Sequence, residues 1–511
     1  MLKVGSEGGR SAARSGAYQA ETGADFRTLL IAAFVGAAVK FGESGMRLWS
    51  ESLEGAAHVG RSVVYGGLNL SPALLAVGCI IGLQTSVVVF LGGVLGWIVL
   101  LPMYGLINGL PENVNGLAAA KSIWSNQIRY VGIGAMLIGG LWTLTKLGRP
   151  VLDSMMALKH SYRASLTSTG LDHAIRTERD ASITWLVVPF ILSLVPMAWI
   201  YVTVVQNLVI GLIMTVIMAI AAFLFSSVAA YMAGLVGSSS NPVSGVTIAT
   251  IMLSSLLLAL LMGQGHPSGP AAALIIGAVV CCAAAMGGDN LQDLKTGHLV
   301  GSTPWKQQIM QVIGVLTGAV VIVPVLTLLQ AKYGIGDVTT AHPHPLSAPQ
   351  AMLMASLTQS VFGAGLPWML VGLGICIGIV VIVIDRRQEA CGAAFRVPVL
   401  AVALGVYLPL KLSAAIFIGG LIAALIQQKT PSRDHLPRRG LLCAAGLITG
   451  EALMGIVLAI PIALSTLWPT MNADPFMFFE IPPLGGWPGL IVIAGVAILL
   501  YRISSVEEER H

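Results

Sequence analysis

A single glutamate stands in a long apolar stretch near the carboxyl end of the sequence. Glu451 is the only Asp, Glu, Lys, Arg or His between Leu441 and Leu467. An ionised carboxylate inside a bilayer is costly unless it is paired, hydrated or protonated, and residues of this kind usually serve a function. Glu451 is therefore a candidate to carry a proton or to set the electric field that a proton feels. A buried, permanently protonated structural glutamate is the alternative.

Two further carboxylates follow another apolar run and lie four residues apart. Asp289 and Asp293 share one face if this segment is helical, and Asn290 and Lys295 add a polar amide and a cation. The lysine can neutralise one of the two carboxylates. The group is a candidate gate or ion-coupling site, and a cytoplasmic loop with local ion pairs is the alternative.

A third polar stretch interrupts two long apolar runs with the string GSSSNPVSG at 237–245. Pro242 removes a backbone donor, glycine permits unusual backbone angles, and Ser240, Asn241 and Ser244 can replace lost hydrogen-bond partners. Helices broken in mid-membrane expose backbone groups that bind substrates or ions. These four residues are therefore predicted to line a substrate path, with an ordinary turn between two helices as the alternative.

Small residues indicate where helices approach one another closely. Gly450 and Gly455 flank the lone glutamate, so we expect another helix to pack there and to supply a partner. The glycine pair at 92–93 predicts close packing in the same way. Ser71-Pro72 marks either a further helix break or a plain helix start, because proline suits the first helical position.

The composition indicates which elements must position these residues. The chain has 511 residues, 28 basic and 23 acidic, with a net charge of +5; 10% are charged and 56% hydrophobic, and the mean hydropathy is +0.84. Soluble domains are about 25% charged, so lipid must cover much of this surface. A cytosolic enzyme, a nucleic-acid-binding protein and a disordered chain are excluded. The six cysteines show no zinc-ligand spacing, and we predict no metal and no cofactor.

The apolar runs predict an all-α, polytopic membrane bundle with broken or re-entrant helices and about 12–14 membrane segments, since a spanning helix needs about 20 apolar residues. Several runs are too short to span alone. The candidate runs lie near 27–41, 70–83, 85–107, 130–146, 183–205, 208–235, 245–263, 271–286, 309–329, 366–384, 397–410, 411–426, 441–467 and 487–501.

Basic residues predict the orientation of this bundle. If residues 1–28 are cytoplasmic and every run crosses, 21 of the 28 Lys and Arg fall on inner segments, as the positive-inside rule requires. Both termini are then cytoplasmic. The predicted organisation is a cytoplasmic tail at 1–28, a first helical group at 29–145, a charged cytoplasmic loop at 146–182, a main helical region at 183–501 and a cytoplasmic tail at 502–511.

Several enzyme motifs are absent from the sequence. There is no GxxxxGK[ST] to cradle nucleotide phosphates and no HExxH to bind a catalytic zinc. Met286 stands where the GxGD motif of intramembrane aspartyl proteases has its first glycine. We therefore predict that the chain is not an enzyme, which leaves secondary transport, a channel or a structural role.

Long polar-containing strings resemble the oligopeptide transporter family in its prokaryotic branch. These strings are GSSSNPVSGVTIATIMLSSLLLAL (237–260), GGDNLQDLKTGHLVGSTPWKQQIMQVIG (287–314) and GLITGEALMGIVLAI (446–460), with similar stretches at 70–102 and 128–144. The resemblance implies an all-helical carrier that arose by duplication. It also implies proton-driven transport of small peptides or, in the yellow stripe-like branch, of metal–chelator complexes.

The start of the chain departs from the family pattern. Members usually carry several membrane segments and a YPEG-type motif before the stretch that Met1-Leu2-Lys3-Val4-Gly5 resembles. The resemblance therefore implies an amino-terminally shortened chain, in which 29–145 is a partial first repeat.

Two hypotheses follow from these observations. The first is a proton-coupled secondary active transporter of oligopeptides or related small solutes, working by alternating access in the inner or plasma membrane. Its partners are the peptide or metal–chelate substrate, protons and the lipid bilayer, with no nucleic acid. Asp289, Asp293 and Lys295 would form an inner gate. The second is a truncated or split membrane subunit without autonomous transport.

Overall fold

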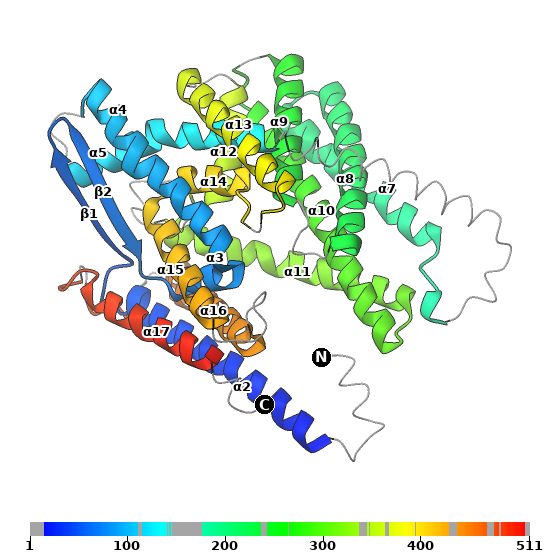
Figure 1. Cartoon of the computed structure of the whole chain (residues 1–511). Coiled ribbons are helices and arrows are strands. Elements are labelled where there is room, and N and C mark those ends of the chain that lie inside the picture. Colours follow the sequence, from blue (N-terminus) through cyan, green and yellow to red (C-terminus); the bar gives the residue numbers. More distant parts are fainter. Residues whose placement is uncertain are drawn as a thin grey trace. The chain divides into compact units, whose positions relative to one another are not determined.

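The computed structural model is built almost entirely of helices (Figure 1). It describes residues 15–110, 115–140, 142, 145, 176–236, 243–263, 265–336, 345–346, 348–362, 367–393, 395–428, 437–467, 475–479 and 482–505. Its elements are α2 (Ser15–Lys40), η1 (Phe41–Gly45), β1 (Ser52–Val59), β2 (Ser62–Asn69), α3 (Pro72–Val94), η2 (Leu95–Leu100), α4 (Leu101–Asn108), α5 (Gly116–Ile123), η3 (Trp124–Ile128), η5 (Arg176–Glu178), α7 (Ile183–Val205), α8 (Leu208–Val236), α9 (Val243–Met262), α10 (Gly269–Val300), α11 (Pro304–Tyr333), α12 (Pro349–Val361), α13 (Trp368–Ala390), α14 (Val399–Tyr407), α15 (Leu410–Gln427), α16 (Arg438–Leu467) and α17 (Trp487–Ser505).

The described chain falls into two compact units, which we treat separately. Unit 1 contains Leu137–Ile322 and Gln350–Leu366. Unit 2 contains Arg14–Met136, Val323–Pro349 and Pro367–His511.

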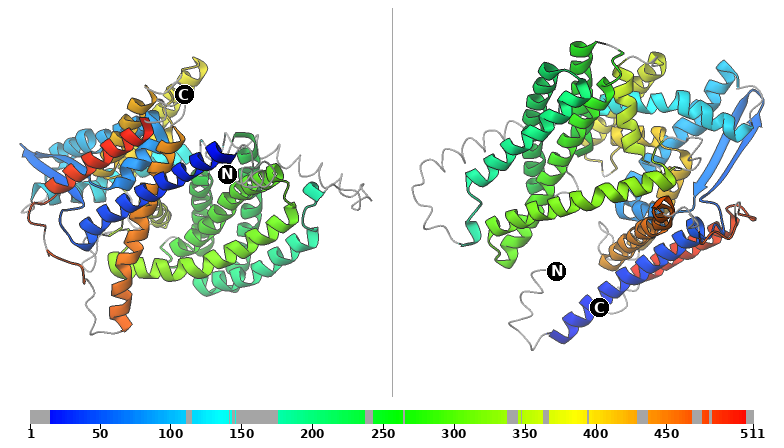
Figure 2. Two further views of the ribbon diagram at one scale, coloured as in Figure 1. Left: turned by 90° about the horizontal axis from the view of Figure 1, so that it is seen from below. Right: turned by 180° about the vertical axis from the view of Figure 1, so that it is seen from behind.

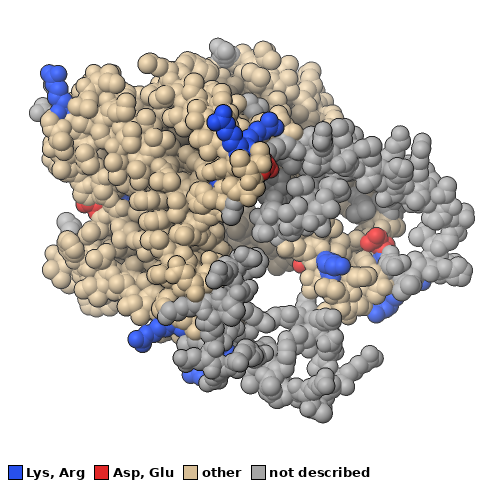
Figure 3. All heavy atoms as spheres, viewed as in Figure 1, with Lys and Arg blue, Asp and Glu red and all other residues tan. Residues whose placement is uncertain are grey.

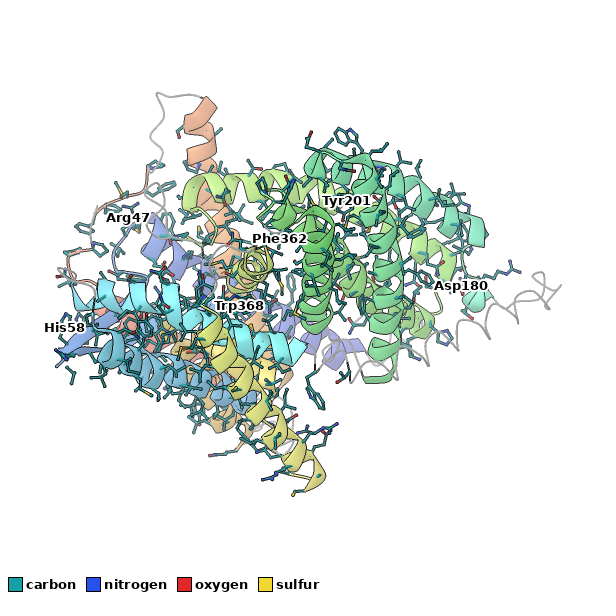
Figure 4. All side chains as sticks on the ribbon, turned by 90° about the horizontal axis from the view of Figure 1, so that it is seen from above. Arg47, His58, Asp180, Tyr201, Phe362 and Trp368 are labelled. Carbon is teal, nitrogen blue, oxygen red and sulfur yellow. The ribbon has the colours of Figure 1, made fainter. Side chains whose placement is uncertain are left out.

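Unit 1 is built on α7, α8, α9 and α10, and α8 and α10 run side by side in Figures 1 and 2. Its apolar core includes Tyr201, Met214 and Phe362; Tyr201 and Phe362 are labelled in Figure 4. A Cβ at Gly287 of α10 would lie 2.6 Å from the carbonyl oxygen of Ser226 on α8. Small residues therefore let these two helices approach backbone to backbone, as in other membrane bundles.

Unit 2 is organised around α3 and α16. The helix α3 packs against α14 and α15, while α16 packs against α2 and α17, and Figure 2 shows α2 (blue), α16 (orange) and α17 (red) close together. A Cβ at Gly78 of α3 would strike the backbone of Ile416 on α15, and one at Gly92 would strike Val402 on α14. The close packing predicted from the glycine pair at 92–93 is confirmed.

The all-helical membrane bundle predicted from the sequence is confirmed. Ten helices among the described residues are long and apolar enough to cross a membrane. Large apolar side chains such as Phe34 (75% exposed) and Met369 (89% exposed) cover their outer faces, and Figure 3 shows few charged residues on the described face. Exposed apolar surface on this scale marks a lipid or protein contact.

The predicted runs at 70–83 and 85–107 are separated by a break in the structure. Both runs lie almost entirely within the apolar stretch Pro72–Asn108, which has 37 residues. Gly82 interrupts it with φ 79° and ψ 172°, a conformation that glycine adopts readily because it has no Cβ. The predicted division between the two runs therefore corresponds to the break at Gly82 within α3.

Two further features were missed by the sequence analysis. β1 and β2 form an antiparallel hairpin, with pairs running from Ser52↔Asn69 to Val59↔Ser62, where only a connection between spans was expected. Apolar periodicity is weak in a short hairpin with many small residues, so hydropathy did not reveal it. The helix α2 also begins at Ser15, inside the stretch predicted as a tail at 1–28.

Candidate functional site

The carboxylate of Glu451, on α16, lies at the amino-terminal end of α3. The Ser71 hydroxyl is 2.8 Å from Oε1 and 3.0 Å from Oε2, and the backbone N–H of Ala73 donates to Oε2 at 2.8 Å. The first N–H groups of a helix lack partners within the helix and carry a partial positive charge. Glu451 therefore acts as a helix cap supplied from a residue 380 positions away in the chain.

Ser71 joins this carboxylate to the start of the helix. Its Oγ accepts a hydrogen bond from the N–H of Leu74 at 3.3 Å, as an N-cap residue does. Its own N–H donates to Oδ1 of Asn69 at 2.9 Å, and the Asn69 side chain donates to Oε1 of Glu51 at 3.0 Å. Ser71-Pro72 is thus a helix start, the second of the two readings left open by the sequence.

A second glutamate of the same unit, on η1, is buried. Glu43 is 6% exposed, and its Oε1 accepts hydrogen bonds from Lys40 at 3.0 Å and from the Ser44 hydroxyl at 3.1 Å. Its Oε2 is buried without a hydrogen-bond partner among the described residues. Glu43 interacts electrostatically with Lys40, Glu51 and Glu451. We call Lys40, Glu43, Glu51 and Glu451 the glutamate cluster.

Close packing of α2 against α16 places the members of this cluster near one another. A Cβ at Gly450 would strike the backbone of Ala33 on α2, so the helix predicted to pack beside Gly450 is present. A Cβ at Gly455 would meet open space, and at that position Tyr333 of α11 donates to the Gly455 carbonyl at 3.4 Å. Lys40 and Glu43 were missed as site residues, although their i, i+3 spacing at the end of an apolar run is visible in the sequence.

The break at Gly82 divides α3 into two half-helices, and side chains satisfy the backbone around it. The buried hydroxyl of Ser86 donates to the carbonyl of Gly82 at 2.8 Å. Gln84 donates to the carbonyl of Arg396 at 3.0 Å, and the Arg396 guanidinium binds both carboxylate oxygens of Asp385 at 2.9 and 3.0 Å. Broken helices of this kind bind ions and substrates in transporters.

Asp289, Asn290, Asp293 and Lys295 all lie on α10, so the predicted helical placement of the two aspartates on one face is confirmed. Asp289, Asp293 and Lys295 are exposed. Gln311 donates to Oδ2 of Asp293 at 3.3 Å.

Lys295 pairs with neither aspartate in the part of the chain that the structure describes. Residues two or six positions apart do not face one another on a helix, so the expected neutralisation is wrong. The segment is also a continuation of the helix to Val300, where the alternative had expected a loop.

The predicted helix break at 237–245 falls mainly outside the described residues. Ser240, Asn241 and Pro242 lie there, and Ser244 lies in the first turn of α9 with its side chain outside the described part. Their role in a substrate path stays a prediction.

A separate set of charged side chains links the hairpin to the helices of unit 2 by ion pairs. Glu54 on β1 is 2.6 Å from Nζ of Lys121 and 2.7 Å from Nζ of Lys411, and Ser52 donates to it at 2.6 Å. Burial disfavours the charged carboxylate, but hydrogen bonds from the two lysines and Ser52 outweigh burial and lower the pKa of Glu54 to about 2.

The fold is that of a polytopic helical membrane protein with ionisable side chains held between its helices. The family model described as OPT oligopeptide transporter protein matches residues 1–462. The chain therefore belongs to the oligopeptide transporter family, and the resemblance inferred from its polar strings is confirmed.

Three relatives show the range of the similarity. A provisionally named oligopeptide transporter of Haemophilus influenzae is 31% identical over 91% of this chain and 77% of its own length. A provisionally named oligopeptide transporter of Saccharomyces cerevisiae is 24% identical over 42% of this chain and 29% of its own. A provisionally named metal–nicotianamine transporter of Oryza sativa subsp. japonica is 24% identical over 77% of this chain and 59% of its own.

Proposed function

We propose that this protein is a secondary active transporter of oligopeptides or related small solutes, coupled to protons and working by alternating access. The family and the name of the bacterial relative support the solute class. The observation that carries the proton coupling is the position of Glu451, a carboxylate from one helix that caps the start of a broken helix. A change of charge on or near this carboxylate changes the electrostatic energy of the cap, and thereby links a proton to helix position.

The chemistry of the unit suits substrates that carry both signs of charge. A free peptide has an ammonium and a carboxylate, and half-helix ends present positive amino termini and negative carboxyl termini. Transport of a metal–chelator complex is a second candidate, favoured by the rice relative. The family also supports a non-enzymatic role.

Uptake by purified protein in proteoliposomes tests the proposal. Labelled di- and tripeptides and metal–chelate complexes are compared, with acid or neutral pH imposed outside. We expect peptide accumulation that requires the proton gradient. Absence of peptide uptake together with metal–chelate uptake would favour the second candidate. Uptake that appears only when a second membrane subunit is added would favour the split-subunit hypothesis.

Glu451→Gln is the decisive variant in this assay, because it keeps volume and hydrogen bonding but removes the charge. We expect it to lose accumulation driven by the pH gradient while it still exchanges substrate across the membrane. A pH profile that overlays the wild type, at matched protein content, would reduce Glu451 to a structural cap.

The substrate path is proposed to include Ser240, Asn241, Pro242 and Ser244. Pro242→Ala tests this, because proline costs about 3 kcal/mol inside a helix and alanine would favour a continuous one. We expect the variant to fold and its uptake to fall sharply. Wild-type uptake would make this stretch an ordinary turn.

The proposed topology places the protein in the cell inner or plasma membrane with both termini cytoplasmic. Reporters fused within 146–182 or 427–440 should be cytoplasmic, and one within 331–350 should be external. The distribution of basic residues supports this orientation. External signals from the first two positions would contradict it.

A further inference from the structure

We propose that Glu43, through its Oε2 atom, holds the exchangeable proton of the glutamate cluster, while Glu451 stays ionised as the cap of α3. This inference rests on the proposed proton coupling and names the residue that performs it. The observation behind it is that the carboxylates of the buried Glu43 and the partly buried Glu451 differ in how their oxygens are satisfied.

Both oxygens of Glu451 have donors. Oε1 lies within hydrogen-bond distance of the Ser71 hydroxyl, and Oε2 accepts from the backbone N–H of Ala73. The partial positive charge at the start of α3 adds a favourable interaction with a carboxylate. A proton on Oε2 would have to displace the N–H donor of a helix, so the ionised form suits this site.

The two oxygens of Glu43 have different surroundings. Lys40 and Ser44 donate to Oε1, whereas Oε2 is buried and has no hydrogen-bond partner among the described residues. An ionised carboxylate costs free energy when one of its oxygens is buried and has no hydrogen-bond donor. A proton on Oε2 removes that charge and leaves both hydrogen bonds to Oε1 in place.

The balance of charge in the cluster favours one bound proton. The groups that interact with the charge of Glu43 are Lys40 from α2, Glu51 from the segment before β1 and Glu451 from α16. One ammonium faces three carboxylates, and close carboxylates rarely ionise together without compensation. Glu51 is exposed and both oxygens of Glu451 have donors, whereas Oε2 of Glu43 is buried and has no hydrogen-bond partner among the described residues.

Two further cations belong to segments beside this cluster. Lys332 donates to the carbonyl of Leu458 on α16, two turns beyond Glu451, and Arg47 follows η1 (Figure 4). The ion pair of Glu43 that the structure describes is with the ammonium of Lys40, at 3.0 Å.

A proton fits this cluster better than a metal ion does. Oxygen-binding cations take six or more oxygen ligands, but the oxygens of Glu451 and Oε1 of Glu43 are already hydrogen-bonded. Within the described ranges, no three His, Cys, Asp or Glu side chains are placed to hold a metal. A proton needs only one free oxygen atom.

Lys40 gives the proton an effect on helix position. Its ammonium is attracted by Glu43, Glu451 and Glu51. When Glu43 takes up a proton, the ammonium no longer has an ionised partner at 3.0 Å, and its attraction to Glu451 gains weight. After Glu43 is protonated, the ammonium of Lys40 therefore competes with the start of α3 for the carboxylate of Glu451. This competition is the coupling that an alternating-access carrier needs.

Infrared difference spectroscopy of the whole protein in liposomes tests the assignment without any substrate. The carbonyl stretch of a protonated carboxylic acid is recorded as pH is raised from acid to neutral, in water and in deuterium oxide. We expect the wild type to lose such a band, Glu43→Gln to lack it, and Glu51→Gln to keep it. A wild-type band in Glu43→Gln, with the band absent from Glu451→Gln, would overturn the proposal.

Lys40→Gln keeps the test valid if Glu43→Gln does not fold. Removing the ammonium that pairs with Glu43 favours the neutral carboxyl, so the midpoint of the band should move to higher pH by about one unit or more. An unchanged midpoint would contradict the proposal. Because the spectra need no transport, failure of peptide uptake would count against the proposed function and leave the residue assignment to be decided by the band.

Discussion

The two acidic sites of this transporter differ in how their carboxylates are held. On α10 in unit 1, Asp289 and Asp293 are neighbours in sequence, are exposed, and make few contacts with the described residues, such as that with Gln311. In unit 2, Glu43 and Glu451 are more than 400 residues apart, yet they belong to one electrostatic cluster. Glu451 is tied to the start of another helix.

This contrast separates residues that share a helix face from residues that share a site. Spacing of four places two side chains on one face, but it does not bring donors to their oxygens. In unit 2 the donors are a lysine on α2, a serine hydroxyl on η1, and a serine hydroxyl and a backbone N–H at the start of α3. Such sites have larger energetic consequences because their polar groups are withdrawn from water.

The contrast depends most on the approach of α2 to α16. In Gly450→Val the new side chain meets the backbone of Ala33, so the two helices must separate. Forced overpacking of this kind costs about 3 kcal/mol, and we expect a large fall in thermal stability in detergent. Gly455→Val, in open space on the same helix, is the control. Equal losses in both variants would show that the close approach is unimportant.

The cap on α3 should show the second largest effect. Glu451→Ala removes the acceptor for Ser71 and for the N–H of Ala73, and loss of a buried cap costs about 2 kcal/mol. Because Glu451 is partly buried, we expect a clear but moderate drop in the unfolding temperature. Asp293→Ala serves as the comparison on α10. If Asp293→Ala destabilises the protein as much, the proposed difference between the two sites is wrong.

Glu54 offers a test by pH. Its folded pKa is about 2, below its ordinary value of 4.5, so its stabilising contribution is complete above about pH 4.5 and is lost as pH falls towards 2. Glu54→Gln should cost about 1 kcal/mol at neutral pH, since Lys121 is half exposed, and should show a flatter acid limb. Glu389→Gln, an exposed carboxylate, is the control. Parallel acid limbs in wild type and Glu54→Gln would contradict the assignment.

The smallest effect on stability is expected on α10. Asp289→Asn lies at an exposed position, where substitutions usually change stability by about 0.5 kcal/mol or less. If the segment forms the proposed inner gate, uptake should fall while the unfolding temperature stays constant. Uptake and stability that both match the wild type would remove the gate from this helix.

The amino-acid sequence by itself determined the class of this protein. A chain with 10% charged residues and long apolar runs can bury its surface only in lipid, and the polar strings between those runs identified the family. It also singled out Glu451, because a lone carboxylate among apolar residues is unusual wherever the helix packs. The helical placement of Asp289 and Asp293 followed from local spacing alone.

Only the tertiary structure decided which residues act together. Lys40 and Glu43 join the glutamate cluster because Gly450 lets α2 approach α16, and a glycine in the sequence does not say which helix will contact it. The β-hairpin was hidden for a related reason, and so were the backbone angles at Gly82: hydropathy measures partition into lipid and carries little information on backbone angles. Contacts between residues far apart in the chain depend on packing, and packing is a property of the whole fold.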